Sequence, residues 1–368
     1  METASTREIV GRLLDFFGDN DCSDIHMSAA RGLWYVKAKS TLKMEPSPVP
    51  ITEHLIESII EEFLPGGVER FERELQGDAS IDVDTKYRGR LAVRVDLEGP
   101  SLTIRLISRT IPTVEKVGVG ESLINAVRQP SGLLLFTGQT GSGKSSSIAA
   151  LLNLVNTTES SSIYTLESPV EFVYPHEMSL VVQREVGPQV ATFAVGIENA
   201  KRSHPKIILV GEILSSETAR AALSAAASGH LVVSTMHAGS TAETVDGLVS
   251  MFPPAEQSLI RTQLAQVLIG IVVQQLIPKT GGGLALAQEI AFNTREFSEL
   301  ILGGDMKLAQ QMLLGQGREA GMVAMEASLD RLVGDNSITP ELALKNSKDR
   351  KTMRDLLHRR GINVKDFA

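Results

Sequence analysis

Hydrophobic positions in the second part of the chain fall into short apolar runs, separated by segments with helical periodicity. The apolar runs predict buried strands at residues 132–137, 162–166, 206–212 and 231–235. Between the first two runs, apolar residues recur at helical spacing from Ile148 to Val155, and residues 217–228 predict a helix of small residues. Strands that alternate with helices predict an α/β fold, with a parallel sheet covered on both faces.

The first 108 residues show a different pattern. Residues 5–17 and the segment that begins at Thr52 have the spacing of amphipathic helices, and residues 24–28 and 33–37 have the pattern of strands. Residues 79–107 alternate between apolar and polar positions, which predicts an antiparallel meander in a small α+β domain. The positions expected on its buried face are Ile81, Val83, Leu91, Val93, Val95, Leu97, Leu102, Ile104 and Leu106.

These patterns divide the chain into an N-terminal α+β domain at 1–108, a linker at 109–113, an α/β domain at 114–294 and C-terminal helices at 295–368. The linker contains Pro112, which disfavours a helix at the residue before it. The C-terminal helices have polar connections and carry no recognisable chemical motif. We therefore expect the chemistry to lie in the α/β domain.

The most apolar segment, Leu259–Ile277, predicts a buried helix. Its continuous apolar core covers only residues 267–273, and Arg261 and several glutamines lie around it. A helix that spans a bilayer needs about twenty predominantly apolar residues, so this segment is too polar for that role.

Composition narrows the class of protein further. The chain has 368 residues, 42% hydrophobic and 22% charged, which is typical of soluble globular proteins with about two domains. Its net charge of −8 argues against coating of nucleic acid as the main activity. Cys22 is the only cysteine, so an intrachain disulfide and a multi-cysteine zinc site are excluded. The N-terminus lacks the pattern of a signal peptide, and we expect a cytoplasmic protein.

A phosphate-binding motif follows the first predicted strand of the α/β domain and opens the next helix. Glycines at this position let backbone N–H groups surround phosphate oxygens at the helix N-terminus, whereas a glycine-rich turn that binds nothing is the alternative. We expect Lys144 to reach the β- and γ-phosphates, and the Ser145 hydroxyl to bind Mg²⁺. The motif consists of Gly138, Gln139, Thr140, Gly141, Ser142, Gly143, Lys144 and Ser145. The sequence therefore predicts a nucleoside triphosphate site.

Further candidate residues follow the predicted strands, whose carboxyl ends meet at one edge of a parallel sheet. Glu212 is a candidate for polarising the attacking water, or alternatively an acid that favours a helix N-terminus. Glu167 could support Mg²⁺ or a water near it, or could be a turn residue before Pro169. His237 could sense the γ-phosphate, although a lone histidine is more often structural.

Arginines form a separate group in the predicted meander. Arg90, Arg94 and Arg105 lie on the face opposite the buried residues of their strands. They could be solvated charges on a wet sheet face, or they could act on a nucleotide.

Together these segments resemble the secretion-superfamily ATPases, in particular the pilus-retraction (PilT-type) branch and its DotB-type relatives. The resemblance extends over about residues 20–335, and it includes Ser23–Ser28 and Arg109–Pro112. The segments that carry it, in the family's order, are residues 138–145, 164–173, 182–186, 207–212 and 229–237.

The resemblance implies a RecA-like P-loop NTPase core, a small PAS-like N-terminal domain and a helical C-terminal extension. It implies that ATP and Mg²⁺ are bound, with Glu212 as the Walker B glutamate. Glu167 and Glu171 correspond to the family's acidic box, and His230 and His237 to its histidine box. Members form rings, usually hexamers, in which N-domain arginines reach the nucleotide, so Arg90, Arg94, Arg105 and Arg109 become candidate catalytic residues.

The chain departs from the family pattern in several places. Glu167-Ser168-Pro169 replaces Glu-Asp-Pro, and Leu214-Ser215 replaces the Arg-Asp that usually follows the Walker B glutamate. Residues 296–301 replace the retraction branch's Ala-Ile-Arg-Asn-Leu-Ile. The paired CxxC motifs common in the extension and type II branch are absent. The first two departures predict slow turnover with ATP affinity retained.

The hypothesis from the sequence is a ring-forming cytoplasmic ATPase that acts at an inner-membrane platform protein. It would power a type IV pilus of the retraction type, or a type IV secretion or conjugation apparatus, without direct contact to nucleic acid. The alternative is a low-turnover, nucleotide-gated accessory or regulatory subunit of such a machine. A nucleic-acid translocase is a further alternative, which the net charge and the lack of an aromatic-basic stretch disfavour.

Overall fold

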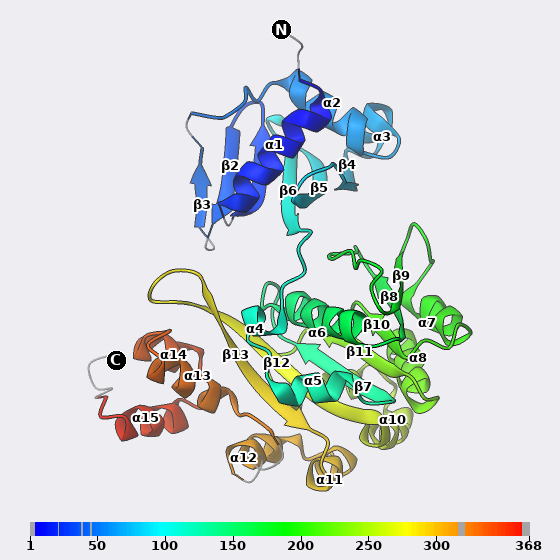
Figure 1. The fold of residues 1–368 in the computed structure, drawn as a ribbon, viewed down its shortest axis with the longest axis vertical. Helices are drawn as coiled ribbons and strands as arrows, with labels where there is room; N and C mark the ends of the chain where they lie inside the picture. The colour runs from blue at the N-terminus through cyan, green and yellow to red at the C-terminus, as the bar shows by residue number, and fades with distance from the viewer. Residues whose placement is uncertain (1–3, 21, 38–39, 45, 316–320, 363–368) are drawn as a thin grey trace. The chain divides into compact units, whose positions relative to one another are not determined.

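The computed structural model describes residues 4–20, 22–37, 40–44, 46–315 and 321–362 (Figure 1). The chain forms two compact units, Met1–Thr110 and Ile111–Ala368, and each has its own sheet and hydrophobic core.

The N-terminal unit contains a six-stranded antiparallel sheet in the order β3-β2-β1-β6-β5-β4. Three helices accompany it, and the apolar sides of α1 and α2 join one face of the sheet in a single core. The strands are β1 (Cys22–Ser28), β2 (Gly32–Lys37), β3 (Ser40–Lys43), β4 (Gln76–Ile81), β5 (Tyr87–Asp96) and β6 (Gly99–Ser108). The helices are α1 (Thr6–Asp19), α2 (Glu53–Phe63) and α3 (Gly67–Glu74).

The alternating pattern predicted the buried face of the meander in most places. Leu91, Leu102 and Ile104 are buried, as the alternation requires. Val95 and Leu97 are exposed, so this part of the prediction was wrong. Leu97 lies in the two-residue turn between β5 and β6, where its side chain points to solvent. Alternation alone does not show where a strand stops being covered.

The second unit contains a seven-stranded sheet in the order β13-β12-β7-β11-β10-β8-β9. All pairs are parallel except β12–β13, which form an antiparallel hairpin that reaches beyond the other strands (Figure 1). Every residue of the central strands β7, β10 and β11 is buried, because helices cover both faces. The strands are β7 (Gly132–Thr137), β8 (Ser162–Glu167), β9 (Leu180–Glu185), β10 (Ile207–Val210), β11 (Leu231–Met236), β12 (Leu268–Pro278) and β13 (Leu284–Phe292).

Alternate residues of β7 belong to two different cores. Leu134 and Phe136 pack with α5 and α6, whereas Leu133 and Leu135 pack in the core that contains α8, α9 and α10. The helices of this part are α4 (Val114–Val117), α5 (Glu121–Val127), α6 (Lys144–Thr158), α7 (Phe193–Lys201), α8 (Ser216–Ala227), α9 (Thr241–Ser250) and α10 (Pro254–Val267). The α/β class predicted from the sequence is confirmed.

The C-terminal part is helical, as predicted, and its apolar side chains extend the core around α8, α9 and α10. Helix α13 packs on β13, where Val323 also pairs with Ile290. The helices are α11 (Arg295–Gly303), the 3₁₀ turn η1 (Met306–Leu308), α12 (Ala309–Leu314), α13 (Met325–Gly334), α14 (Pro340–Asn346) and α15 (Arg350–Arg359). Within the described ranges, no helix combines the length and the apolar character needed to cross a bilayer.

The prediction of one buried helix at Leu259–Ile277 was wrong. Helix α10 ends at Val267, and the apolar run that follows is the buried strand β12. A short apolar run has no periodicity that distinguishes a helix from a buried strand. The β-branched residues Ile269, Ile271 and Val272 favour the strand, and its partner β13 was not predicted from the sequence either.

Candidate nucleotide-binding site

The glycine-rich loop 138–143 connects β7 to α6, and Lys144 is the first residue of that helix. Gly138 has a φ of 141°, and a Cβ there would lie 2.4 Å from the carbonyl oxygen of Gln274. The loop is therefore packed directly on β12. Gly143, the residue before the helix, has a φ of 91°, in the left-handed region that favours glycine. As at any helix N-terminus, the first N–H groups of α6 have no partner within the helix and are available to a ligand.

The Lys144 ammonium is folded back onto its own loop. Its Nζ donates to the carbonyl oxygens of Gly138 at 2.8 Å and Gln139 at 3.1 Å. Burial lowers the pKa of Lys144, and the carboxylates of Glu171 and Glu212 act in the opposite direction. The Ser142 hydroxyl in the same loop is buried and has no hydrogen-bond partner among the described residues. A buried cation, an unsatisfied hydroxyl and a helix N-terminus together fit a bound phosphate chain.

Buried polar side chains support the loop from behind. The Gln274 Nε2 group of β12 donates to Ser147 Oγ at 2.9 Å, and both residues are buried. Thr137, which precedes the loop, lies with its Oγ1 3.4 Å from the hydroxyl donor of Thr244 in α9. Sequence reasoning missed these supports, because a polar residue within an apolar segment does not reveal its partner.

The acidic segment after β8 is held together by Glu167. Its carboxylate accepts from Thr165 Oγ1 at 2.7 Å, from Gln183 Nε2 at 3.3 Å and from the Glu171 backbone N–H at 3.4 Å. Gln183 also donates to the Phe172 carbonyl oxygen at 2.8 Å. Burial raises the pKa of Glu167, and its hydrogen bonds oppose the rise. Glu167 is thus a buried, well-satisfied carboxylate that fixes the loop carrying the exposed Glu171.

Glu212 and His237 meet at the same edge of the sheet. His237 Nε2 lies 3.7 Å from Glu212 Oε2, and both side chains remain partly exposed. The Gly211 N–H donates to the Leu166 carbonyl oxygen at 2.7 Å, which ties the ends of β10 and β8 together. The structure therefore brings the carboxyl ends of β8, β10 and β11 to one edge, as the parallel topology predicted.

The structure places His230 away from this edge. It precedes β11, at the opposite end of the strand from His237, and its Nδ1 lies 3.2 Å from the Ala225 carbonyl oxygen. His230 is buried. Its contacts are those of a residue that holds the turn between α8 and β11.

The candidate arginines of the N-terminal unit fall into two classes. Arg105 pairs with Asp24 at 3.0 Å, and Arg109 contacts Asp82 and the Val83 carbonyl oxygen. Arg90 and Arg94 are exposed, and neither side chain has a hydrogen bond or ion pair with any residue that the structure describes. The cations of Arg105 and Arg109 are therefore engaged within their own unit, whereas those of Arg90 and Arg94 are available.

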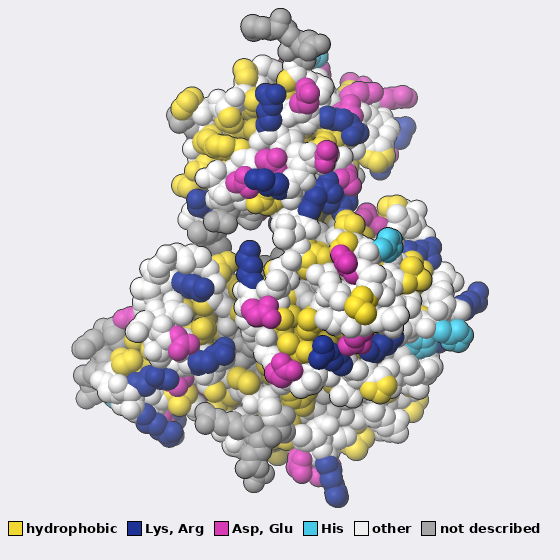
Figure 2. Space-filling view, in the orientation of Figure 1, with side chains coloured by type: hydrophobic (Ala, Val, Ile, Leu, Met, Phe, Trp, Pro, Cys, Tyr) yellow, Lys and Arg dark blue, Asp and Glu magenta, His cyan; other side chains and the backbone are white. Residues whose placement is uncertain are grey.

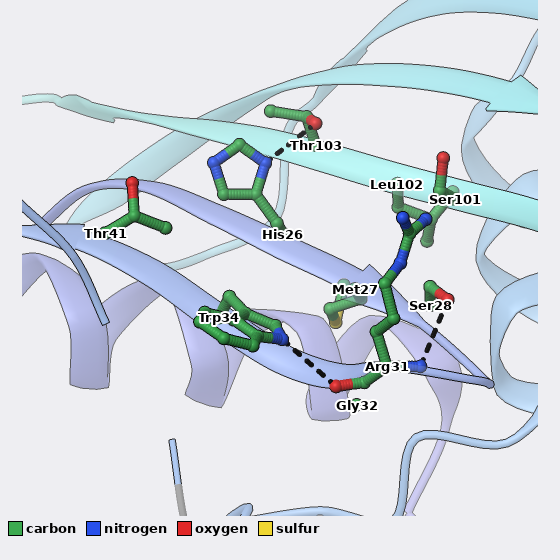
Figure 3. A pocket seen from close by; sticks show the side chains of 10 residues that line it. All are labelled: His26, Met27, Ser28, Arg31, Gly32, Trp34, Thr41, Ser101, Leu102 and Thr103. Carbon is green, nitrogen blue, oxygen red and sulfur yellow. Dashed lines mark hydrogen bonds between the residues drawn. The ribbon is translucent and has the colours of Figure 1, made fainter. Parts of the chain in front are cut away.

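A hollow of about 370 Å³ lies on the N-terminal sheet where β1, β2 and β6 run together (Figure 3). His26 Nδ1 faces Thr103 Oγ1 at 3.0 Å, and Trp34 Nε1 donates to the Arg31 carbonyl oxygen at 3.0 Å. The Arg31 guanidinium pairs with Asp96 and, at 3.3 Å, with Glu98. Because this cation is neutralised within its own unit, the hollow is poorly suited to capture a phosphate.

A larger pocket of about 500 Å³ adjoins the phosphate loop within the second unit. Gly143 and Ser146 line it from the start of α6, and Leu276 lines it from β12. Lys116 of α4 and Arg331 of α13 contribute cationic side chains. The sequence did not predict this pocket, because its walls come from segments far apart in the chain.

Comparison with known proteins gives a consistent result. Residues 9–356 match the type II/IV secretion system protein family. The chain is 35% identical to the type IV pilus retraction ATPase PilT of Pseudomonas aeruginosa, over 92% of this chain and 98% of PilT. The chain therefore belongs to this family. It is an ATPase, and as such it binds a nucleotide.

Solved structures agree with this assignment. The pilus retraction motor PilT with bound ADP matches this ATPase with a TM-score of 0.85 and 30% identity, over 96% of this chain and 100% of that chain. The ATPase DotB of Legionella pneumophila matches with a TM-score of 0.80 over 93% of this chain and 96% of DotB. At 24% identity, the second likeness concerns the fold alone.

Two of the departures from the family pattern, Leu214 and Ser168, occupy exposed positions of this ATPase, whereas Ser215 is half-buried. Leu214 is 63% exposed, and Ser168 is also exposed. Ser215 caps the N-terminus of α8, because its Oγ accepts from the Thr218 N–H at 3.3 Å. Serine and aspartate are both good residues at this position of a helix, so the exchange retains the cap.

Proposed function

We propose that the protein works as an assembled ring, usually of six chains in this family, and that ATP hydrolysis drives its domain motions. The observation that carries this proposal is the convergence of the phosphate loop, Glu212 and His237 at one edge of the parallel sheet. The near-complete match to a pilus retraction ATPase supports a machine of the type IV pilus or of type IV secretion and conjugation.

Lys144 is assigned to the β- and γ-phosphates. When a nucleotide binds, the two hydrogen bonds from Lys144 to loop carbonyl oxygens are replaced by stronger, charge-assisted hydrogen bonds to phosphate. Ser145 follows it in the first turn of α6, which is the position for a Mg²⁺ ligand. Bound Mg²⁺ supplies charge neutralisation on the phosphate oxygens.

Glu212 is assigned to the attacking water, which its carboxylate orients and polarises. His237 lies against that carboxylate and can respond to the γ-phosphate. Glu167 is assigned a supporting role, because its oxygens are already used to hold Thr165, Gln183 and the Glu171 backbone. It keeps Glu171 near Lys144, where the two charges interact.

The pocket beside α6 is assigned to the nucleoside. Ser146 is the second residue after Lys144, where backbone N–H groups of such loops approach the α-phosphate. A nucleoside that continues from this point enters the pocket lined by Leu276 and Lys116. Its volume of about 500 Å³ suits a small ligand.

Assembly is assigned to the N-terminal unit. Arg90 and Arg94 are the candidates for contact with a nucleotide held by a neighbouring chain, because their cations are not engaged by described residues. The ring would lie in the cytoplasm, at an inner-membrane platform protein.

Two alternatives make different demands. A low-turnover accessory subunit is favoured by Leu214, because a neutral, exposed side chain follows the Glu212 strand end where the family carries charge.

A nucleic-acid translocase requires a basic stripe. On the faces that Figure 2 shows, Lys and Arg side chains are interspersed with Asp and Glu, which argues against such a stripe there.

The test is steady-state phosphate release with ATP and Mg²⁺, measured while the protein is diluted and its mass is followed by light scattering. We expect activity per chain to fall as the assembly dissociates. Constant activity per chain in a demonstrated monomer would contradict the ring. ATP binding without phosphate release at any concentration would favour the accessory subunit.

A further inference from the structure

We propose that the ion pair between Lys348 and Glu289 positions the loop that carries His237, and so sets the rate of hydrolysis. The inference rests on the proposed role of His237 and extends it to the C-terminal helices. Glu289 lies in β13 and is 3% exposed. Its Oε2 contacts Lys348 Nζ at 2.9 Å, and its Oε1 accepts from both the backbone N–H and the Oγ1 hydroxyl of Thr241, at 2.8 and 2.7 Å.

Thr241 is the first residue of α9 and follows His237 by four positions. The N-terminus of a helix carries a partial positive charge, so a carboxylate is well placed against it. A buried carboxylate is nevertheless costly without a counter-charge, and Lys348 supplies one. The two oxygens of Glu289 thus act separately, since one fixes the start of α9 and the other contacts the C-terminal helices.

Lys348 is itself fixed by the residues around it. Its backbone N–H and that of Asp349 both donate to Glu326 Oε1, at 3.0 and 2.8 Å. Glu326 is fully buried in α13, and Asp349 caps the N-terminus of α15. The lysine therefore projects from a rigid junction of two C-terminal helices. A displacement of these helices would be transmitted to α9 through the ion pair.

The same first turn of α9 also contacts the residue that precedes the phosphate loop. Thr244 Oγ1 lies 3.4 Å from Oγ1 of Thr137, the residue before Gly138. Ser240, which caps α9, accepts from the Glu243 N–H at 3.1 Å. The segment from His237 to Thr244 is thus held between the nucleotide edge and the C-terminal helices. Loosening one side should disturb the His237–Glu212 contact more than it disturbs phosphate binding by Lys144.

Steady-state hydrolysis by the full chain tests this inference with Lys348→Met, which removes the charge while retaining much of the side chain. We expect kcat to fall about tenfold, the scale of coupling between contacting groups, while KM for ATP changes less than about twofold. Lys348→Arg should restore most of the rate. Glu289→Gln should lower kcat similarly, and the double variant should be no slower than the slower single variant.

Lys206→Met is the matched control. Lys206 and Glu159 also form a partly buried lysine–glutamate pair, at 2.6 Å, but Lys206 precedes β10 and lies at the amino end of the sheet. We expect this variant to lose less thermal stability, because Glu159 is more exposed than Glu289 and keeps Arg128 as a partner, and to retain kcat. If both lysine variants lower kcat equally, or if Lys348→Met leaves kcat unchanged, the inference is wrong. Should Lys348→Met fail to fold, Lys348→Gln is measured against the same criteria.

His237→Ala separates this inference from the proposed function. If His237→Ala is impaired and Lys348→Met is not, only the role of the ion pair fails. If His237→Ala hydrolyses ATP like the wild type, the assignment of the loop fails, and the ion-pair inference fails with it. Impairment of both, with the Lys206→Met control unaffected, is the expected result.

Discussion

The two sheets of this ATPase use their charged residues in opposite ways. In the parallel sheet, Lys144, Glu167, Glu212 and His237 follow different strands and yet gather at one edge. In the antiparallel sheet, the arginines are spread over neighbouring strands. Arg105 is paired within the unit, whereas Arg90 is not paired with any described residue.

The difference follows from strand direction. Parallel strands all end at the same edge of the sheet. Residues at their carboxyl ends therefore lie near one another, and this can be predicted without knowledge of the strand register. Antiparallel strands share only a face, and the direct neighbours across two strands are set by register. Register places Arg90 opposite Arg105, two like charges, and Asp24 opposite Arg105 on the other side. The strand directions of the parallel sheet therefore bring its candidate site residues together. The antiparallel sheet presents cations on one face, and their role depends on the molecule that binds there.

The largest effect is expected at the convergent edge, with Lys144→Ala. Loss of the ammonium removes the charge on the β- and γ-phosphates, and we expect phosphate release to fall by at least about a hundredfold. Circular dichroism should show an intact fold. Normal steady-state turnover in a folded variant would show that Lys144 does not act on the nucleotide. The contrast between the two sheets would then fail, because it rests most strongly on this residue.

A second large effect is expected with Glu212→Gln. The amide cannot accept a proton from water, so hydrolysis should fall on the order of a hundredfold or more while ATP remains bound. Filter binding of labelled ATP measures how much nucleotide remains bound, and analysis of the retained nucleotide measures how much of it has been hydrolysed. Conversion of the retained ATP to ADP at the wild-type rate would show that another group orients the water.

A smaller effect is expected on the other sheet, from Arg90→Ala combined with Arg94→Ala. If these cations act on a neighbour's nucleotide, kcat of the assembled protein should fall on the order of tenfold or more, while the residual activity of the diluted monomer stays unchanged. Arg105→Ala is the comparison variant, and we expect a smaller loss because its charge is engaged by Asp24. An equal loss of kcat in the double variant and in Arg105→Ala would mean that an ion pair within the unit does not decide which arginines contribute to hydrolysis.

The smallest effect concerns the pH dependence of stability. Burial raises the pKa of Glu167 above 4.5, so the folded state binds this proton more readily than the unfolded state. The stabilisation from this proton is complete when the pH is below the pKa of Glu167 in the unfolded state. It is lost as the pH rises through the pKa of Glu167 in the folded state. The free energy of unfolding of the wild type, minus that of Glu167→Gln, should therefore fall as the pH rises above about 4.5. Urea denaturation measures this difference, and a constant value would contradict the direction of the shift.

Much of the convergent edge could be predicted from the sequence. The apolar runs before the phosphate loop and before Glu212 define strands, and their order along the chain fixes the edge. The meander in the N-terminal unit was predicted from alternation, apart from Val95 and Leu97, which lie where the sheet is no longer covered.

The rest depends on contacts that sequence periodicity does not encode. The run after Val267 is apolar on all sides, so its pattern could not distinguish strand β12 from a helix. Gln274 and Glu289 are polar residues in buried strands, and their partners Ser147 and Lys348 lie far away in the chain. Such pairs are found only once the fold brings the segments together.

Ser215 changes how sequence differences within this family should be weighed. Its hydroxyl caps the start of α8 in the way that an aspartate side chain would cap it there. An exchange between these two residues therefore retains the cap of α8. Leu214, one position nearer to Glu212 and open to solvent, has no such equivalence with arginine. Of the two adjacent departures, the leucine is therefore the one whose side chain cannot replace the residue of the family pattern.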